Sequence, residues 1–195
     1  NLLEIPDCVC YEEAAMLEPA AVALHALKRS GFKKGDTVVV IGPETIGMIL
    51  SQMVKLLGAS KVVLVGRTQT KLDFAKTYGV ENICNSTTSD VSEWVSRNID
   101  SSGADIVFEG TGASMSFNTS LKIVKSSGTI VALGNPIDDM TLEKDFYWKL
   151  LRKQLQNYGT WNSSFGINDN EWTLYLYWLE NEKLDLKRLI SHRQD

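Results

Sequence analysis

The sequence predicts an α/β fold, a doubly wound parallel sheet with helices on both faces, and three observations carry this prediction. Short runs rich in valine and isoleucine alternate with stretches of helical apolar spacing along most of the 195-residue chain, as in proteins whose strands and helices follow one another. The candidate strands are apolar throughout, as strands covered on both faces are. One candidate strand stops at a glycine and turns into a helix.

The turn at this glycine is a candidate binding site for the pyrophosphate of a nucleotide. An apolar run at residues 38–41 stops at Gly42, and helical apolar spacing begins a few residues later. Free backbone N–H groups and the positive end of the helix dipole attract phosphate at such a turn. Gly42 and Gly47 match the first and third glycines of the G-x-G-x-x-G pattern. We predict that the cofactor binds at Gly42, Pro43, Glu44, Thr45, Ile46 and Gly47.

Glu44 stands where the pattern has its middle glycine, which normally lets the backbone approach the pyrophosphate. The side chain of Glu44 either points outward or repels the phosphates. We therefore expect Glu44→Gly to tighten dinucleotide binding, and unchanged affinity would mean that the carboxylate already points away. Pro43 donates no N–H, which the site tolerates only if this position needs no donor.

Two helices are expected before this strand. Residues 1–6 are expected to be extended, and a short helix begins at about Tyr11. A longer helix is predicted from about Pro19 to residue 29, because proline is best tolerated in a first turn, and Gly31 ends it. His25 lies on the apolar side of this helix and is expected to pack in the core.

Strands and helices continue to alternate after the turn, and the pattern changes after residue 142. No repeat or low-complexity linker divides the chain, so residues 1–195 are predicted to form one dinucleotide-binding domain of the Rossmann type. Residues 189–195 are expected to end the chain without a closing element. Further strands are expected at residues 61–65, 82–84, 105–109, 129–133 and 154–161, and further helices at 70–78, 90–99, 114–125, 144–151 and 171–179.

Composition excludes several classes of protein. The net charge is −4 and no long uninterrupted run of basic residues is present, so a broad nucleic-acid surface is not expected. No run of about 18 apolar residues occurs, so no membrane span is expected. Cys8, Cys10 and Cys84 cannot all pair and form no set of four at metal-ligand spacing. A reduced, cytoplasmic protein with small-molecule partners is predicted.

The end of the second strand bears on the choice of cofactor. NAD sites place an acidic residue there for the ribose 2′-OH, and an arginine nearby accommodates the 2′-phosphate of NADP. This chain has Gly66, Arg67 and Thr68 there, with Lys71 close behind. Because these side chains can contact a phosphate, we predict NADP, with NAD as the alternative. Arg67 could equally be an ordinary solvated loop arginine.

Two more loops follow strands at the same edge of the predicted sheet, where ligands of doubly wound proteins bind. Thr111 and Gly112 follow the strand at 105–109. Leu133, Gly134 and Asn135 end or follow the strand at 129–133. All five are candidate cofactor-binding residues, and an ordinary glycine turn is the alternative.

Six motifs in this order resemble the cofactor-binding domain of the zinc-containing medium-chain dehydrogenases, and within them the polyol and polyol-phosphate dehydrogenases, the galactitol-1-phosphate 5-dehydrogenases in particular. The similarity covers nearly the whole chain. The motifs are EEAAMLEPAAVALHA at 12–26, G-x-x-x-I-G at 42–47, DIVFEGTG at 105–112, KLLRKQL at 149–155, GTWNSSF at 159–165 and LISHR at 189–193.

This resemblance implies a zinc-dependent oxidoreductase that transfers hydride between a polyol or polyol phosphate and a nicotinamide cofactor. It implies that the chain is the cofactor-binding part without the catalytic domain, that it holds no catalytic residue and that it is inactive alone. Glu18 would be a ligand of the zinc or a partner of its water, although a charge at a helix N-terminus is the simpler interpretation.

The same resemblance places two further residues and an interface. Trp161 and Asn162 would lie near the nicotinamide amide, although packing is the commoner role of such an aromatic residue. The loops at Thr111 and Leu133 would line the nicotinamide side. The edge strand near residues 159–165 would join two subunits into a homodimer.

Two other functions remain open from the residues alone. A stand-alone dinucleotide-sensing module would account for Glu44 and for the absent catalytic domain. A methyltransferase is disfavoured, since its ribose normally needs an acid where Gly66 stands. The sequence upstream of Asn1 would separate enzyme from sensor.

Overall fold

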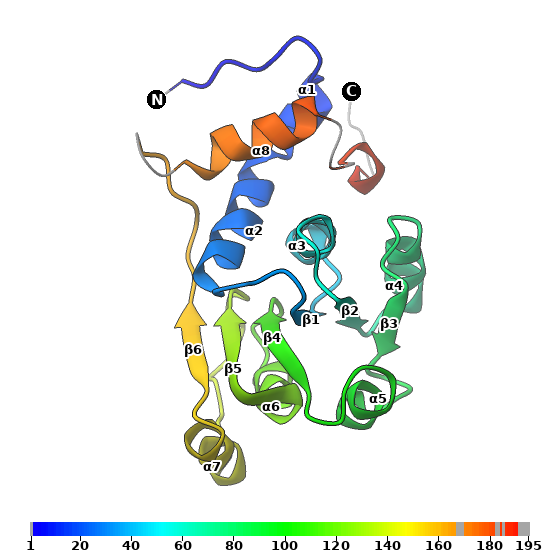
Figure 1. Ribbon diagram of the computed structural model, residues 1–195, viewed down its shortest axis with the longest axis vertical. Coiled ribbons are helices and arrows are strands. Elements are labelled where there is room, and N and C mark those ends of the chain that lie inside the picture. The colour runs from blue at the N-terminus through cyan, green and yellow to red at the C-terminus, as the bar shows by residue number, and fades with distance from the viewer. Residues whose placement is uncertain (1, 167–169, 182–183, 185, 191–195) are drawn as a thin grey trace.

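The computed structural model describes residues 2–166, 170–181, 184 and 186–190. Its centre is a six-stranded sheet in which every pair of neighbours is parallel, in the order β3-β2-β1-β4-β5-β6 (Figure 1). The chain moves outward from β1 in one direction and then restarts on the other side with β4, which confirms the doubly wound fold and creates a switch point between β1 and β4. The strands are β1 (Thr37–Ile41), β2 (Lys61–Gly66), β3 (Asn82–Asn85), β4 (Ala104–Glu109), β5 (Val124–Ala132) and β6 (Gln156–Gly159).

Helices cover both faces of the sheet, as predicted (Figure 1). Val38 and Val40 belong to the core that faces α2, α3, α4 and α8, whereas Val39 and Ile41 belong to the core that faces α5, α6 and α7. Successive side chains of a strand point to opposite faces, so an all-apolar strand fills both cores. The helices are α1 (Tyr11–Ala15), α2 (Leu17–Arg29), α3 (Thr45–Leu56), α4 (Gln69–Lys76), α5 (Val91–Asn98), α6 (Ser114–Ile123), α7 (Lys144–Arg152) and α8 (Glu171–Glu180), with a 3-10 helix at Lys187–Leu189.

Helix α2 begins at Leu17, two residues before the predicted start. Pro19 is the third residue of the helix, where its missing N–H would have no intrahelical partner. The helix ends where predicted, with Ser30 as its C-cap and Gly31 at φ +70°.

Two strands, β5 and β6, differ from the prediction by two residues or more at a boundary, whereas the other four differ by one residue. Strand β5 begins at Val124, inside the region expected to be helical, and its pairing with β4 is irregular, with Ser127 at φ +59°. Strand β6 begins only at Gln156, because Gln154 has φ +52°, which an extended strand does not accommodate. It ends at Gly159, so Trp161 lies beyond it.

The expectations for the chain ends can be compared only in part. Leu189 ends the 3-10 helix Lys187–Leu189. Residues 191–195 and Asn1 lie outside the described part of the chain. No helix among the described residues is long and apolar enough to cross a membrane.

Candidate functional site

The loops after β1, β4 and β5 meet at one edge of the sheet. The N–H of Gly110 donates to the carbonyl oxygen of Ile41 at 2.8 Å, and the N–H of Leu133 donates to that of Glu109 at 2.9 Å. A Cβ atom added to Gly134 would lie 2.1 Å from the nitrogen of Gly112. The predicted loop segments Thr111–Gly112 and Leu133–Asn135 therefore lie in close backbone contact, beside the turn at Gly42.

The turn from β1 into α3 has the geometry of an anion-binding helix N-terminus. Gly42 has φ +117°, and a Cβ on Gly47 would lie 2.0 Å from the carbonyl oxygen of Gly42. Both glycines are thus required, one by backbone conformation and the other by close approach. The first backbone hydrogen bond of α3 runs from the N–H of Met48 to the carbonyl oxygen of Glu44, at 2.9 Å. The N–H groups of Thr45 and Ile46 come before this bond and are therefore available to an anion.

Glu44 is the N-cap residue of α3, but its side chain caps nothing. Its Oε1 atom lies 2.5 Å from Nζ of Lys71 in the first turn of α4. The side chains are 70% and 45% exposed, respectively. Lys71, predicted to contact the cofactor, is thus paired with a carboxylate of the turn between β1 and α3, where the pyrophosphate is predicted to bind.

Pro43 explains why a glycine ends β2. A Cβ on Gly66 would lie 2.5 Å from Cγ and 2.8 Å from Cδ of Pro43, closer than real Cβ atoms come. The proline ring therefore occupies the space in which an NAD-type acidic side chain would begin. The carbonyl of Gly66 is also fixed, because it accepts from the N–H of Ser86 at 2.9 Å.

Arg67 and Thr68 are both exposed at the start of α4. Thr68 is the N-cap residue of α4 and makes no side-chain capping hydrogen bond. Both side chains can therefore turn toward a ligand above the end of β2, which is the region where the predicted 2′-phosphate would lie.

Glu109 holds the loop after β4 in place, a role that was not predicted from the sequence. Its side chain is buried and accepts from the N–H of Thr111 at 2.8 Å, from its hydroxyl at 2.5 Å, and from the N–H of Gly112 at 3.2 Å. A carboxylate bonded by three donors holds the loop after β4 in one conformation. The signal in the sequence was an acidic residue ending an apolar strand directly before Gly110.

Trp161 and Asn162 lie on a separate segment after β6. Trp161 is 79% exposed, so the packing alternative is wrong for this side chain. Asn162 has φ +59°, and its side-chain oxygen accepts from the N–H of Ser163 at 2.9 Å. Among the described residues, neither side chain forms a hydrogen bond or an ion pair with the loops after β1, β4 and β5, although the neighbouring Thr160 donates its N–H to the carbonyl oxygen of Ala132 at 3.0 Å.

The segment after Asn162 is tied to helices α2 and α8 through a buried carboxylate. Glu171 is fully buried, and its oxygen atoms lie 3.3 Å from Nδ1 of His25, 3.2 Å from Nζ of Lys28 and 2.6 Å from the N–H of Ser164. His25 was expected to pack among apolar side chains of the core. Its ring is instead partly exposed and hydrogen-bonded to the carboxylate of Glu171, the first residue of α8.

Glu18 lies exposed in the first turn of α2. No group of three or more His, Cys, Asp or Glu side chains that could hold a metal exists among the residues that the structure describes. Glu18 alone does not fit a zinc site, because structural and catalytic zinc takes at least three protein ligands.

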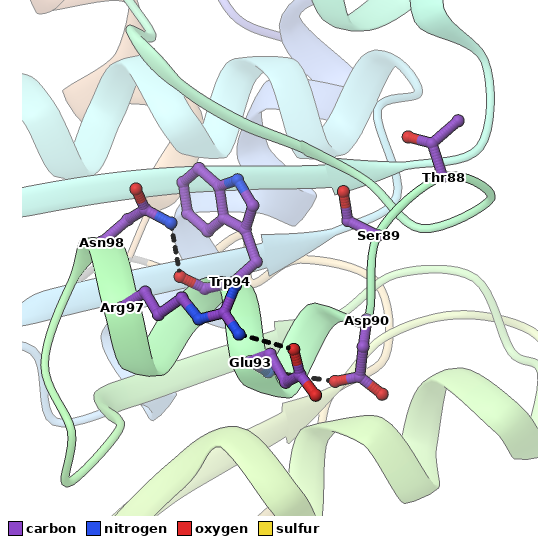
Figure 2. A pocket seen from close by; sticks show the side chains of 7 residues that line it. All are labelled: Thr88, Ser89, Asp90, Glu93, Trp94, Arg97 and Asn98. Carbon is purple, nitrogen blue, oxygen red and sulfur yellow. Dashed lines mark hydrogen bonds and ion pairs between the residues drawn. The ribbon is translucent and has the colours of Figure 1, made fainter.

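A surface hollow lies along α5, and none of the predicted site residues lines it (Figure 2). Asp90 accepts from the N–H groups of Ser92 and Glu93 at 2.8 and 3.0 Å. The bond from Glu93, followed by that from Ser92, lowers the pKa of Asp90. Glu93 also accepts from Arg97 at 3.1 Å, and Asn98 donates to the carbonyl oxygen of Trp94 at 2.8 Å, so most of the charged and amide groups here are bonded within α5. The hollow has a volume of about 290 Å³ and is lined by Thr88, Ser89, Asp90, Glu93, Trp94, Arg97 and Asn98.

Comparison with known proteins gives one consistent result. The family described as zinc-binding dehydrogenase matches residues 45–181. D-xylulose reductase of Saccharomyces cerevisiae is 30% identical over 194 residues, which are 97% of this chain and 52% of that protein.

Two solved structures share the fold over nearly the whole chain. Galactitol-1-phosphate dehydrogenase from Escherichia coli superposes with a TM-score of 0.87 at 26% identity, covering 96% of this chain and 54% of that one. A zinc-binding dehydrogenase from Sinorhizobium meliloti bound to NADP superposes with a TM-score of 0.86 at 27% identity, covering 97% and 54%. The chain spans about half the length of the relatives it matches.

Proposed function

This chain belongs to the zinc-binding dehydrogenases, and we propose that it is the cofactor-binding domain of an enzyme that transfers hydride between a polyol or polyol phosphate and a nicotinamide cofactor. The observation that carries this proposal is the glycine turn at Gly42 and Gly47, placed at the switch point between β1 and β4. Such a turn binds a dinucleotide in open α/β sheets.

The residues present fit a dinucleotide. The N–H groups at the start of α3 would hold its pyrophosphate. Arg67 and Thr68 would contact the ribose end, and the loops fixed by Glu109 would border the nicotinamide side. When bound, the nicotinamide supplies the hydride acceptor or donor.

We propose NADP as the preferred cofactor, with NAD as the alternative. Two features of the described residues support this choice. Pro43 fills the space that an acidic side chain at position 66 would need, and Arg67 is exposed beside it. An arginine there suits a 2′-phosphate.

The substrate and the metal are proposed from the relatives. D-xylulose reductase is named for a ketose, whose reduction gives a polyol, and galactitol-1-phosphate dehydrogenase for a polyol phosphate. A polyol, or a phosphorylated one similar to galactitol-1-phosphate, is therefore the proposed substrate class. Zinc would need ligands beyond those described here, with Glu18 as at most one of them. We therefore propose that the 195-residue chain alone does not turn over a polyol phosphate, and steady oxidation by it would contradict this.

We also propose a cytoplasmic homodimer. Strand β6 is one of the two edge strands of the sheet, and its four residues are all exposed. Its outer backbone groups, apart from the carbonyl oxygen of Gly159 that accepts from Arg29, can pair with a second copy. The exposed thiol of Cys8 and the other two free cysteines suit a reducing compartment. Sedimentation of the chain would test the assembly.

Calorimetric titration of the chain with NADPH and with NADH tests the proposed function. We expect both to bind and NADPH to bind more tightly. Gly47→Ala should abolish binding, because its methyl group would meet the carbonyl oxygen of Gly42 at 2.0 Å. A folded wild-type chain that binds neither cofactor would refute the proposal, and equal or tighter binding of NADH would refute the preference for NADP.

A further inference from the structure

An ion pair joins the two parts of the nucleotide site that would bind different phosphates. Glu44 belongs to the turn that would hold the pyrophosphate, and Lys71 belongs to the first turn of α4, beside the end of β2. Their side-chain atoms lie 2.5 Å apart, although the residues are 27 positions apart in sequence. Neither side chain is buried, at 70% and 45% exposure, so packing does not impose this contact.

The pair determines how much positive charge the ribose end of the site presents. Arg67 and Lys71 are the two cations of the predicted 2′-phosphate region, and Glu44 neutralises one of them. A 2′-phosphate would have to compete with the Glu44 carboxylate for Lys71. A ribose that carries only a hydroxyl there would not compete, because it offers no charge for Lys71 to bind.

We propose, on the basis of the function proposed above, that Glu44 is a specificity-determining residue that weakens the preference for NADP by holding Lys71 in an ion pair. The free energy needed to separate Lys71 from Glu44 offsets part of the favourable free energy with which the protein binds the 2′-phosphate. The carboxylate also repels the 5′-phosphate and the pyrophosphate, but this repulsion is the same for NADP and NAD and leaves their ratio unchanged.

The test uses two ligands that differ only in the 2′-phosphate, namely 2′,5′-ADP and 5′-AMP. Dissociation constants are measured by calorimetry at low and constant ionic strength for the wild-type chain and for Glu44→Gln. Glu44→Gln should tighten 2′,5′-ADP more than 5′-AMP, and the ratio of the two constants should shift by about two- to fivefold, as expected for an exposed ion pair. Raising the salt concentration should reduce the shift, because exposed charges are screened.

Two variants separate this mechanism from a general change in charge. In a Lys71→Gln background, Glu44→Gln should no longer change the ratio, because the cation that it releases is gone. Asp73→Asn is the matched control: it also removes a negative charge from this region, but Asp73 pairs with Lys76 on the outer turn of α4 at 3.3 Å. Its effect on the ratio should be smaller than that of Glu44→Gln.

Three results would overturn the inference while leaving the proposed function intact. These are equal tightening of both ligands by Glu44→Gln, an unchanged or smaller preference for 2′,5′-ADP, and a shift in the ratio that persists without Lys71. If the folded wild-type chain binds none of NADPH, NADH, 2′,5′-ADP and 5′-AMP, the proposed function itself fails, and the inference fails with it.

Discussion

Gly66→Ala should destabilise the protein because its methyl group would clash with the ring of Pro43. The added methyl carbon would lie 2.5 Å from Cγ of Pro43, whereas ordinary contact begins at 3.4 Å, so the ring would have to withdraw by about 0.9 Å. It has little freedom to do so, because proline fixes its own φ. The adjacent Gly42 is itself confined, since a Cβ there would lie 3.3 Å from atoms of Gly110 and Thr111.

Overpacking of this kind costs about 1–3 kcal/mol of unfolding free energy. At about 2 kcal/mol, the midpoint of thermal unfolding should fall by about 4–8 °C in a chain of this length. Urea denaturation followed by circular dichroism measures the same change, and an unchanged slope would show that only stability was altered.

A second substitution, Pro43→Ala, tests whether the clash with the proline ring causes the loss of stability. In a Pro43→Ala background the ring atoms are gone, so Gly66→Ala should cost at least about 1 kcal/mol less than in the wild-type chain. Gly159→Ala is the control for adding a methyl group to a strand glycine, because a Cβ there meets nothing within 4 Å. Equal costs of Gly66→Ala with and without Pro43, or no cost at all, would refute the reasoning.

Three further predictions concern stability and reactivity. Glu109→Gln keeps the shape of a buried side chain but weakens bonds to three donors, so chemical denaturation should show a loss of about 1.5–3 kcal/mol; an unchanged midpoint would contradict this. Asp90→Ala removes the N-cap of α5 and should cost about 1 kcal/mol at pH 7. Since the pKa of Asp90 is lowered on folding, this difference should be present above the unfolded pKa and vanish as the pH falls through the folded pKa; a difference independent of pH would argue against the cap. Burial, and then the charge of Asp90, raises the pKa of Cys84 to about 11, so at pH 8 iodoacetamide should modify the exposed Cys8 well before Cys84, and equal rates by mass spectrometry would be the contrary result.

The sequence predicted the fold well because strands and helices here have clear local signals. Apolar runs such as residues 38–41 gave β1, and helical spacing followed by Gly31 gave the end of α2. The errors fall where tertiary contacts replace local preference. Strand β5 begins at Val124 instead of residue 129, in a stretch paired irregularly with β4. This pairing could not be predicted, because it depends on a neighbouring strand and not on a local sequence pattern.

The candidate site was predicted as a set of loops but not as a set of contacts. The carboxyl ends of parallel strands meet at one edge, which is why the loops at Thr111 and Leu133 could be grouped with Gly42 from sequence alone. The partners of individual side chains could not be predicted. His25 was assigned to the core, yet Glu171, 146 residues later, accepts a hydrogen bond from its Nδ1 atom at 3.3 Å.

The sequence by itself determined the alternation of strands and helices, the order of the motifs and the glycine turn, since each depends on residues that are close together in the chain. The tertiary structure alone decided that Pro43 confines position 66, that Glu109 fixes the loop after β4, and that Glu44 pairs with Lys71. The pairs Pro43–Gly66 and Glu44–Lys71 join the turn after β1 to the last residue of β2 and to the first turn of α4. They exist only because parallel pairing brings the ends of these two strands together.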